Sequence, residues 1–346
     1  MTAVFLEERV AADDVLVAEI AERYGLERPT GWSDLGGSWT TNLKLTFRER
    51  AALVARIHGA YTSPDRLTAV QAARIAVADA GLPAIRPLDT PSGPSFVRLG
   101  NGRLAELEPF VDWNQRMKTG PLLEAGFGVL ARLHDALRDA SIPAAGETAT
   151  AANHLHSEVA LEASRRGADR IRGWRDTVLT GLADRAVRHL EAVDRAEQPL
   201  RAGQLTQLVH GDFWDNNVLF HDGRLAAVLD FDFMAVRPRI DDLALTVYFV
   251  LLEPGRALPT AEDRAQVRRY LDAYDAAASI RLSAEERAML PLAVARQPAW
   301  SLGRWAVDLD DHDARQHVNH VVGELPVAQA VLAELPAWQD ALLAVR

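Results

Sequence analysis

The sequence predicts an α+β protein with two lobes, a small antiparallel β lobe followed by a larger, mostly α-helical lobe. Short runs with the alternating pattern of strands gather before residue 108. Helical periodicity dominates after that point, interrupted by one hairpin pattern at residues 205–233. A length of 346 residues fits about two such units. We expect an N-terminal lobe over residues 1–108 and a C-terminal lobe over residues 109–346.

The N-terminal lobe is expected to hold a first helix, a five-stranded sheet and a second helix inserted into that sheet. Residues 5–24 carry apolar side chains at helical spacing, and Gly25 follows them. Leu43, Leu45 and Phe47 alternate with polar residues, which is the period of a half-buried strand. The runs typical of strands are 32–35, 40–47, 52–58, 85–90, 95–99 and 103–107, and the inserted helix is expected over 65–80.

The C-terminal lobe is expected to be a helical assembly. Residues 122–137 show the pattern most clearly, with leucines and one phenylalanine recurring at helical spacing. The other expected helices are 151–165, 169–195, 242–252, 261–276, 284–307 and 325–344.

The composition excludes several classes of protein. The 38 Lys and Arg residues face 48 Asp and Glu residues, so the formal net charge is −10 and a nucleic-acid partner is not expected. The absence of cysteine excludes disulfides, thiolate nucleophiles and cysteine-bound zinc. No signal-peptide pattern is found at the start, and no apolar stretch reaches the roughly 18 residues of a membrane span. We therefore expect a cytoplasmic protein with no membrane partner; the oligomeric state is not indicated.

Residues 208–232 carry the pattern with the clearest chemistry. They read H-G-D-F-W-D-N-N from His210 to Asn217, followed by two apolar runs that an Asp-Gly turn joins. Such a turn between apolar runs predicts a β-hairpin. Folding the hairpin brings Asn217, at the start of one arm, near Asp230, at the end of the other. Asp212 lies on the loop that leads into the hairpin.

These three side chains are the inventory that phosphoryl transfer from a nucleotide needs. Mg²⁺ prefers a few oxygen ligands from the protein and completes its shell with phosphate and water. Asn217 and Asp230 are expected to supply those metal ligands. A separate carboxylate has to orient the attacking hydroxyl and accept its proton, and Asp212 is expected to do so.

The stretch resembles the aminoglycoside phosphotransferase and choline kinase superfamily, whose fold is similar to that of protein kinases. The spelling H-G-D-x-x-x-x-N, with Gly211 where protein kinases have Arg, is typical of its small-molecule branch. Residues 120–137 match the helix that opens the α lobe, and Asp242 opens a D-L-A that matches the family's. The resemblance implies a protein-kinase-like bilobal fold that binds ATP or GTP with Mg²⁺ between its lobes. It also implies that His210 braces the catalytic loop.

The resemblance further implies which residues contact the nucleotide. Arg56 is the best match to the family's phosphate-binding Lys, and an Arg can pair with phosphate oxygens bidentately. The Glu expected on the next helix has no clear match in residues 64–80; Gln71 is the nearest candidate, with a hydrogen bond in place of an ion pair. The remaining matched positions are the phosphate-covering hairpin Gly36, Gly37 and Ser38, and a hinge over 106–110, where the backbone of Glu106, Leu107 and Glu108 is expected to bind adenine.

The acceptor is expected to be a small molecule with a hydroxyl group. Only 11 residues separate Asp230 from Asp242, which leaves no room for the long segment on which protein kinases hold a peptide. Trp214 and Asp215 lie beside the expected base and are candidate substrate contacts. Asp308 and Asp311 belong to an acidic run, 308–313, that is either a site for a cationic substrate or a solvated helix end.

Three functions fit this sequence. The first is a kinase of an antibiotic or related secondary metabolite, for resistance or self-protection. The second is a primary-metabolism kinase of an amino alcohol such as choline or homoserine. The third is a nucleotide-binding pseudokinase.

Overall fold

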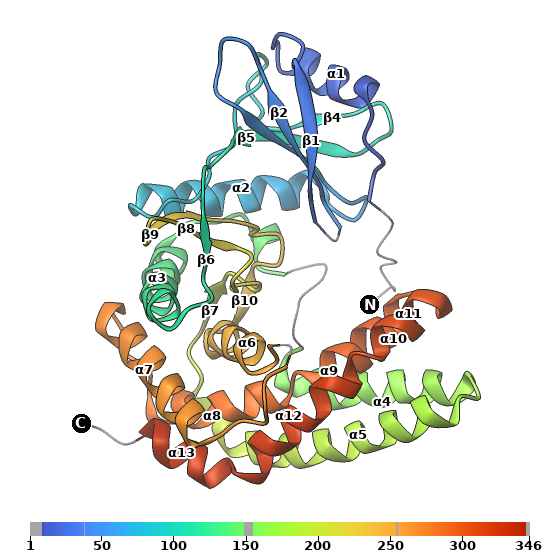
Figure 1. Cartoon of the computed structure of the whole chain (residues 1–346), viewed down its shortest axis with the longest axis vertical. Coiled ribbons are helices and arrows are strands. Elements are labelled where there is room, and N and C mark those ends of the chain that lie inside the picture. The colour runs from blue at the N-terminus through green and yellow to red at the C-terminus, as the bar shows by residue number, and fades with distance from the viewer. Residues whose placement is uncertain (1–8, 38, 149–154, 254, 344–346) are drawn as a thin grey trace.

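The computed structural model describes residues 9–37, 39–148, 155–253 and 255–343. Figure 1 shows two lobes, with the N-terminal sheet and two helices above and the helical remainder of the chain below. This arrangement confirms the predicted α+β class, with a small antiparallel β lobe and a larger α lobe. Among the described residues, no helix is both long enough and apolar enough to cross a membrane.

The N-terminal sheet has five antiparallel strands in the order β1-β2-β3-β5-β4. One of its faces packs on helix α1, whose Val17 and Ile20 are buried against Leu43 and Leu45 of the sheet. The second helix, α2, lies between the sheet and the C-terminal lobe (Figure 1). The bounds are α1 Asp14–Arg23, β1 Gly31–Gly36, β2 Thr41–Thr46, β3 Leu53–Ile57, α2 Pro64–Asp79, β4 Val97–Arg98 and β5 Leu104–Pro109.

Two predictions for this lobe were wrong in detail. The first helix begins at Asp14 rather than residue 5, because Asp13 caps it by accepting a hydrogen bond of 2.8 Å from the Leu16 amide; residues 1–8 lie outside the described residues. The predicted strand 85–90 is an extended loop. Its Pro87 cannot donate to a ladder, and its backbone bond to the sheet is 2.7 Å from the Leu88 amide to the Leu107 carbonyl.

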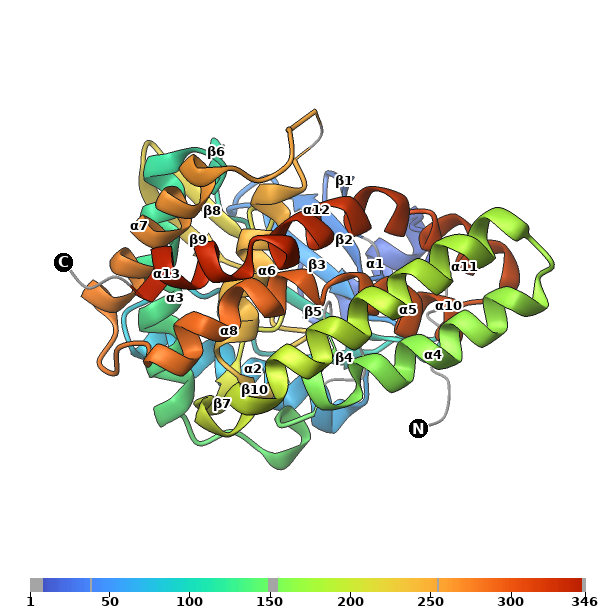
Figure 2. The same cartoon turned by 90° about the horizontal axis from the view of Figure 1, so that it is seen from below.

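The C-terminal lobe is built around a core of buried side chains from α2, α3, α6, α7, α8 and the short strands. Figure 2 shows α4 and α5 side by side, extending from this core as an antiparallel pair. The helices are α3 Gly120–Asp139, α4 Ser157–Gly173, α5 Thr177–Glu197, α6 Ile240–Leu251, α7 Ala261–Ala277, α8 Ala284–Ala295, α9 Pro298–Trp300, α10 Ala306–Asp308, α11 Asp311–Val318, α12 Val321–Ala333 and α13 Leu335–Leu343. Short 3₁₀ segments are η1 Ala144–Gly146 and η2 Gln198–Gly203, and η3, Ser301–Trp305, is a π-helical turn.

Four predicted helices, 151–165, 169–195, 284–307 and 325–344, have different bounds in the structure; residues 151–154 lie outside the described residues. The chain turns at Arg175, which adopts a left-handed φ of 58°, so α4 ends at Gly173 and α5 begins at Thr177. Within the predicted 284–307 helix, α8 ends at Ala295. The short helix α9 and the π turn η3 follow it from Pro298. The predicted 325–344 helix is two helices, α12 and α13.

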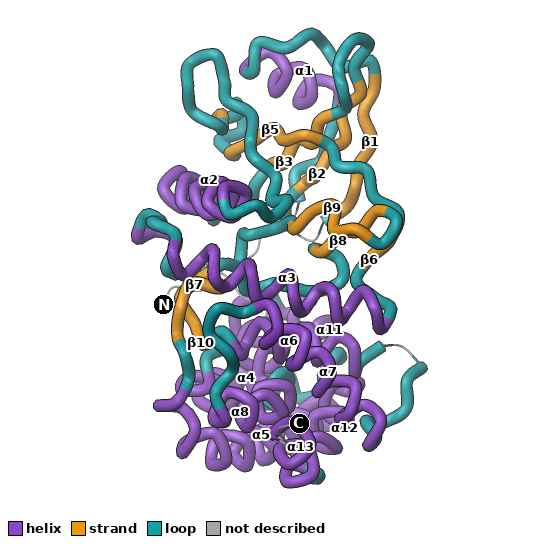
Figure 3. Tube along the Cα trace, turned by 90° about the vertical axis from the view of Figure 1, so that its left-hand side faces the viewer, coloured by secondary structure: helices purple, strands orange, loops and turns teal. Residues whose placement is uncertain are grey.

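The predicted β interlude lies where the two lobes meet, as Figure 3 shows by the orange strands at mid-height. Two small antiparallel sheets form there, β10-β7 and β6-β8-β9. The strands are β6 Gln115–Arg116, β7 Thr206–Val209, β8 Val218–His221, β9 Arg224–Val228 and β10 Ala235–Pro238. The predicted hairpin around the Asp-Gly turn is confirmed as β8 paired with β9.

Candidate active site

The loop between β7 and β8 is fixed by His210. Its Nδ1 accepts a hydrogen bond of 3.2 Å from the Asp212 amide, and its Nε2 lies 2.9 Å from the Leu229 carbonyl. The ring therefore carries its proton on Nε2, which donates to the carbonyl. Burial lowers the pKa of His210, in keeping with a neutral ring. The side chain thus braces the loop by a bond at each nitrogen.

The same loop is held from below by Asp242, at the start of α6. Its carboxylate accepts hydrogen bonds of 2.8 Å from the amides of both His210 and Gly211, and lies 3.2 Å from His134 Nε2. Burial would raise the pKa of Asp242, but its hydrogen bonds and the two histidines hold it below the ordinary value. Gly211 has a φ of 81°, and a Cβ there would lie 2.1 Å from the Phe233 carbonyl oxygen. Only glycine fits that position.

Asp212 and Asn217 are joined directly. The Asn217 side-chain amide donates a bond of 2.8 Å to the Asp212 carboxylate and one of 2.9 Å to its backbone carbonyl. Both side chains are at least nine-tenths buried. Because the amide nitrogen points at Asp212, the amide oxygen of Asn217 is the group left to face a cation.

The hairpin brings Asp230 to this pair. Val218 opposes Val228 across the ladder, and the Leu229 amide donates 2.8 Å to the Asn217 carbonyl, so Asp230 follows directly. Asp230 adopts a left-handed φ of 60°, and its side chain is 36% exposed. The structure therefore places a carboxylate, an amide and a second carboxylate together, as the spacing indicated.

Arg56 of β3 reaches from the N-terminal sheet to the carboxylate of Asp230. Its Nη2 lies 3.2 Å from Asp230 and 3.2 Å from Asp232. Thr40, beside the β1–β2 hairpin, also donates to Asp232, over 3.3 Å. The tip of that hairpin is formed with left-handed glycines at Gly36 and Gly37, whereas Ser38 lies outside the described residues.

The residues present fit a magnesium–nucleotide complex. No group of three or more His, Cys, Asp or Glu side chains suited to a metal ion occurs in the described part of the chain. A nucleotide-bound Mg²⁺ needs only one or two protein oxygens, because phosphate and water supply the rest. The Arg56 guanidinium on Asp230 also marks this carboxylate as a site that attracts a cation.

The predicted hinge over residues 106–110 falls mostly inside strand β5, and its adenine contacts stay a prediction. Glu106, Leu107 and Glu108 lie inside β5, opposite Arg56, Ala55 and Val54 of β3. Both backbone groups of Leu107 are already bonded, its amide to the Tyr24 hydroxyl at 3.2 Å and its carbonyl to the Leu88 amide. The segment that leaves the sheet and leads into the lower lobe follows Pro109, so adenine contacts are to be sought there.

The side chains of β5 form a buried ionic cluster that the sequence patterns did not identify. Glu106 is fully buried and accepts hydrogen bonds of 2.6 Å from Arg74 and 2.8 Å from Gln71, both on α2. Glu108 accepts 2.6 Å from the same Arg74. Burial would raise the pKa of Glu106, but Arg74, then His58 and Arg56, hold it well below its ordinary value. Two glutamates at alternate positions of an apolar strand were the signal that a cation had to lie opposite them.

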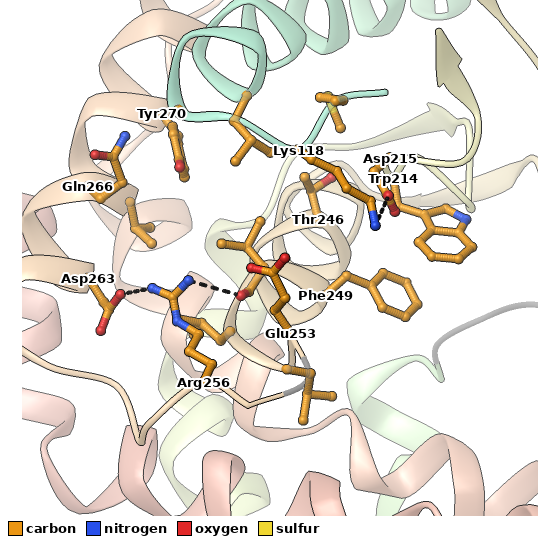
Figure 4. Close-up of a pocket in the computed structure, with 17 residues that line it drawn as sticks. Lys118, Trp214, Asp215, Thr246, Phe249, Glu253, Arg256, Asp263, Gln266 and Tyr270 are labelled. Atoms are coloured by element: carbon orange, nitrogen blue, oxygen red, sulfur yellow. Dashed lines mark hydrogen bonds and ion pairs between the residues drawn. The ribbon is translucent and has the colours of Figure 1, made fainter. Parts of the chain in front are cut away.

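A cavity of about 420 Å³ adjoins the catalytic loop, between α3, α6 and α7 (Figure 4). Trp214 and Asp215 line its edge, where Trp214 stacks on Phe249 at 4.4 Å and Asp215 pairs with Lys118 at 3.2 Å. Its other side is lined by α7 residues, among them Tyr270. The two candidate substrate contacts that follow Asp212 in the sequence therefore line a pocket.

The acidic run 308–313 has partners of its own, which favours the helix-end interpretation over a substrate site. Asp308 pairs with Arg304 at 3.1 Å. Asp311 accepts 2.8 Å from Arg170 and 3.1 Å from the Trp174 ring nitrogen, both on or beside α4. The carboxylate of Asp310 caps α11 by accepting a hydrogen bond of 2.9 Å from the Asp313 backbone amide. The structure ties these carboxylates to the helices of the C-terminal lobe.

Comparison with known proteins agrees with this geometry. A family model described as "Phosphotransferase enzyme family" (APH) matches residues 33–292. No curated protein sequence matches. Solved structures share the fold. One is an amicoumacin kinase, hAmiN, in complex with AMP-PNP, Ca²⁺ and Ami, with a TM-score of 0.69, 14% identity, and coverage of 93% of this chain and 94% of that one. Another is a microcompartment-associated aminopropanol kinase, with a TM-score of 0.71, 18% identity, and coverage of 93% of this chain and 98% of that one.

A third solved structure is a spectinomycin phosphotransferase in complex with ADP and spectinomycin, with a TM-score of 0.53, 14% identity, and coverage of 91% of this chain and 98% of that one. At such identities these likenesses speak for the fold, while the family model spans most of the chain. The chain belongs to the phosphotransferase enzyme family, the aminoglycoside-phosphotransferase and choline-kinase-like small-molecule kinases.

Proposed function

We propose that this kinase transfers the γ-phosphoryl group of ATP or GTP to a hydroxyl of an antibiotic or related secondary metabolite. The observation that carries the proposal is the cluster of Asp212, Asn217 and Asp230: Asn217 donates 2.8 Å to the Asp212 carboxylate, and a 2.8 Å bond from the Leu229 amide to the Asn217 carbonyl brings the adjacent Asp230 beside them. Nucleotides in the solved structures of the amicoumacin and spectinomycin kinases support the choice of co-substrate.

In this proposal Asp212 orients the acceptor hydroxyl and takes its proton as the oxygen attacks the γ-phosphorus. Asn217 keeps that carboxylate in place through its amide nitrogen. The amide oxygen of Asn217 and the carboxylate of Asp230 hold Mg²⁺, which neutralises charge on the phosphates when bound. Arg56 binds phosphate oxygens, and the hairpin with Gly36 and Gly37 covers them. Because water is a competing acceptor, the acceptor has to fill the space beside Asp212.

The cavity beside Trp214 and Asp215 is the place proposed for the acceptor. Its volume of about 420 Å³ is in the range of sites for drug-sized ligands. This size favours an antibiotic over an amino alcohol such as choline. The aminopropanol kinase with the same fold keeps the amino alcohol as the second candidate.

The test is release of nucleoside diphosphate from Mg–ATP and Mg–GTP against aminoglycosides, nucleoside and peptide antibiotics, choline and homoserine. We expect acceptor-dependent turnover that Asp212→Asn lowers by at least about a hundredfold. Asp139→Asn, a change at an exposed carboxylate, is the matched control. Full turnover by a folded Asp212→Asn protein would contradict the assigned base, and nucleotide binding without turnover of any acceptor would favour a pseudokinase.

A further inference from the structure

The guanidinium of Arg56 has acidic neighbours on two sides. Toward the cleft, Nη2 contacts Asp230 and Asp232, each at 3.2 Å. On the other side, Nε lies 3.6 Å from Glu106, as an ion pair without a hydrogen bond. Arg56 and Glu106 are 7% and 0% exposed. The arginine is thus held between a buried carboxylate in the upper lobe and the carboxylates of the cleft.

The register of the sheet produces this pairing. Arg56 of β3 lies directly opposite Glu106 of β5, so both side chains leave the sheet on the same face. Glu108 is two residues further along the strand, opposite Val54, and on that same face. Of the two glutamates, Glu106 is therefore the one that the fold aligns with Arg56.

Glu106 is itself anchored by helix α2. Arg74 donates hydrogen bonds of 2.6 Å to Glu106, 2.6 Å to Glu108 and 2.8 Å to the Ile85 carbonyl. Gln71, one helical turn earlier, donates 2.8 Å to the other oxygen of Glu106. With both of its oxygens bonded to α2, the Glu106 carboxylate cannot swing to follow Arg56, so Arg56 has to come to it.

Binding of Mg–nucleotide changes the cleft side of this arrangement. In the proposed function Asp230 would hold Mg²⁺, and Arg56 would bind phosphate oxygens in place of its present carboxylate partners. Glu106 is then the acid that keeps the arginine extended across the cleft. His58 also lies near Glu106. Its Nε2 is 3.4 Å from the Glu106 carboxylate, and neither of its buried ring nitrogens has a hydrogen-bond partner among the described residues.

We propose that Glu106, anchored by Arg74 and Gln71, is the positioning residue that aims Arg56 at the nucleotide phosphates. In this chain the acid behind the phosphate-binding cation comes from strand β5, and helix α2 supplies a cation and an amide instead. The inference rests on the proposed function, since it requires that nucleotide binds at Arg56. It adds the claim that the carboxylate can be carried by strand β5 or by helix α2, provided that the carboxylate lies between Arg56 and Arg74.

The experiment measures the dissociation constant of Mg–AMP-PNP by calorimetry on the full chain, with thermal stability recorded for every variant. Glu106→Gln is expected to weaken nucleotide binding by about tenfold. The double variant Gln71→Glu/Glu106→Gln exchanges the amide and the carboxylate of two side chains that share a 2.8 Å hydrogen bond. It is expected to restore nucleotide affinity to within about threefold of the wild type. Glu108→Gln is the matched control, because it removes a glutamate from the same strand face and the same Arg74.

The outcomes separate this inference from a structural role and from the proposed function. If Glu106→Gln is destabilised yet binds nucleotide like the wild type, or if Glu108→Gln weakens binding equally, the positioning role is overturned. If Glu106→Gln does not fold, the double variant decides, since loss of its nucleotide affinity in a folded protein overturns the inference. A wild-type protein that does not bind Mg–AMP-PNP overturns the proposed function itself.

Discussion

The side-chain amide of Asn217 donates two hydrogen bonds to Asp212, 2.8 Å to the carboxylate and 2.9 Å to the backbone carbonyl. One residue thereby fixes the proposed base while its own oxygen points elsewhere. The two proposed roles, base and metal site, are therefore mechanically linked. An amide suits this position because it has donors on one atom and an acceptor on the other.

Asn217→Asp tests this link. The variant keeps an oxygen for the metal but loses the N–H donors and brings a second negative charge beside Asp212. We expect kcat to fall by about a hundredfold or more, with nucleotide affinity changed much less. Steady-state turnover and calorimetry measure the two quantities. Asn216→Asp, at the neighbouring residue that bonds exposed Arg116, should keep its kcat; an equal loss there would assign the effect to charge alone.

Gly211→Ala tests the packing under the catalytic loop. A Cβ at this residue would lie 2.1 Å from the Phe233 carbonyl, and the φ of 81° is strained for alanine. We expect a loss of about 2–4 kcal/mol in the free energy of unfolding, measured by urea denaturation, together with low turnover. Gly223→Ala has a similar φ of 77° but open space around it, so it should cost less. Equal costs would show that backbone strain dominates and the contact does not.

The catalytic loop and hairpin could be predicted because their determinants are local. An Asp-Gly turn between apolar runs fixes the β8–β9 pairing, and that pairing alone brings Asn217 near Asp230. The spacing from Asp212 to Asn217 then places the proposed base. None of these steps needs knowledge of a distant segment.

The ionic cluster behind Arg56 could not be predicted in the same way. Gln71 was expected to replace a carboxylate that pairs with Arg56, but its amide bonds Glu106, and Arg74 takes the central place. Which face of α2 meets β5 depends on packing between elements 30 or so residues apart. The overlap of the predicted hinge with β5 was not foreseen for a related reason, since the end of β5 is set by its pairing with β3.

Glu324 predicts a pH dependence of stability. Burial raises its pKa to about 7, although hydrogen bonds from Tyr248 and Ser301 lower it in part. A carboxyl with a folded-state pKa above its unfolded value of about 4.5 stabilises the fold while protonated, and this stability is lost as the pH rises from about 4.5 to 7.

We therefore expect the wild type to lose up to about 3 kcal/mol relative to Glu324→Gln between pH 5 and pH 8. Urea denaturation of both proteins at the two pH values gives the difference. Glu334→Gln, at an exposed carboxylate that pairs with Arg264, should follow the wild type. Parallel pH profiles for Glu324→Gln and the wild type would show that Glu324 titrates normally in the folded state.

Filling the cavity tests where the acceptor binds. Val250 of α6 lines the cavity beside Phe249, so Val250→Trp places an indole in the space proposed for the acceptor. We expect the acceptor KM to rise by about tenfold or more, because the larger side chain excludes part of the ligand. The dissociation constant of Mg–AMP-PNP should stay the same, since the proposed nucleotide contacts lie at Arg56 and Asp230. Val322→Trp, on the exposed surface of α12, is the same substitution away from the cavity. An unchanged acceptor KM in a folded Val250→Trp protein would contradict the placement of the acceptor in this cavity.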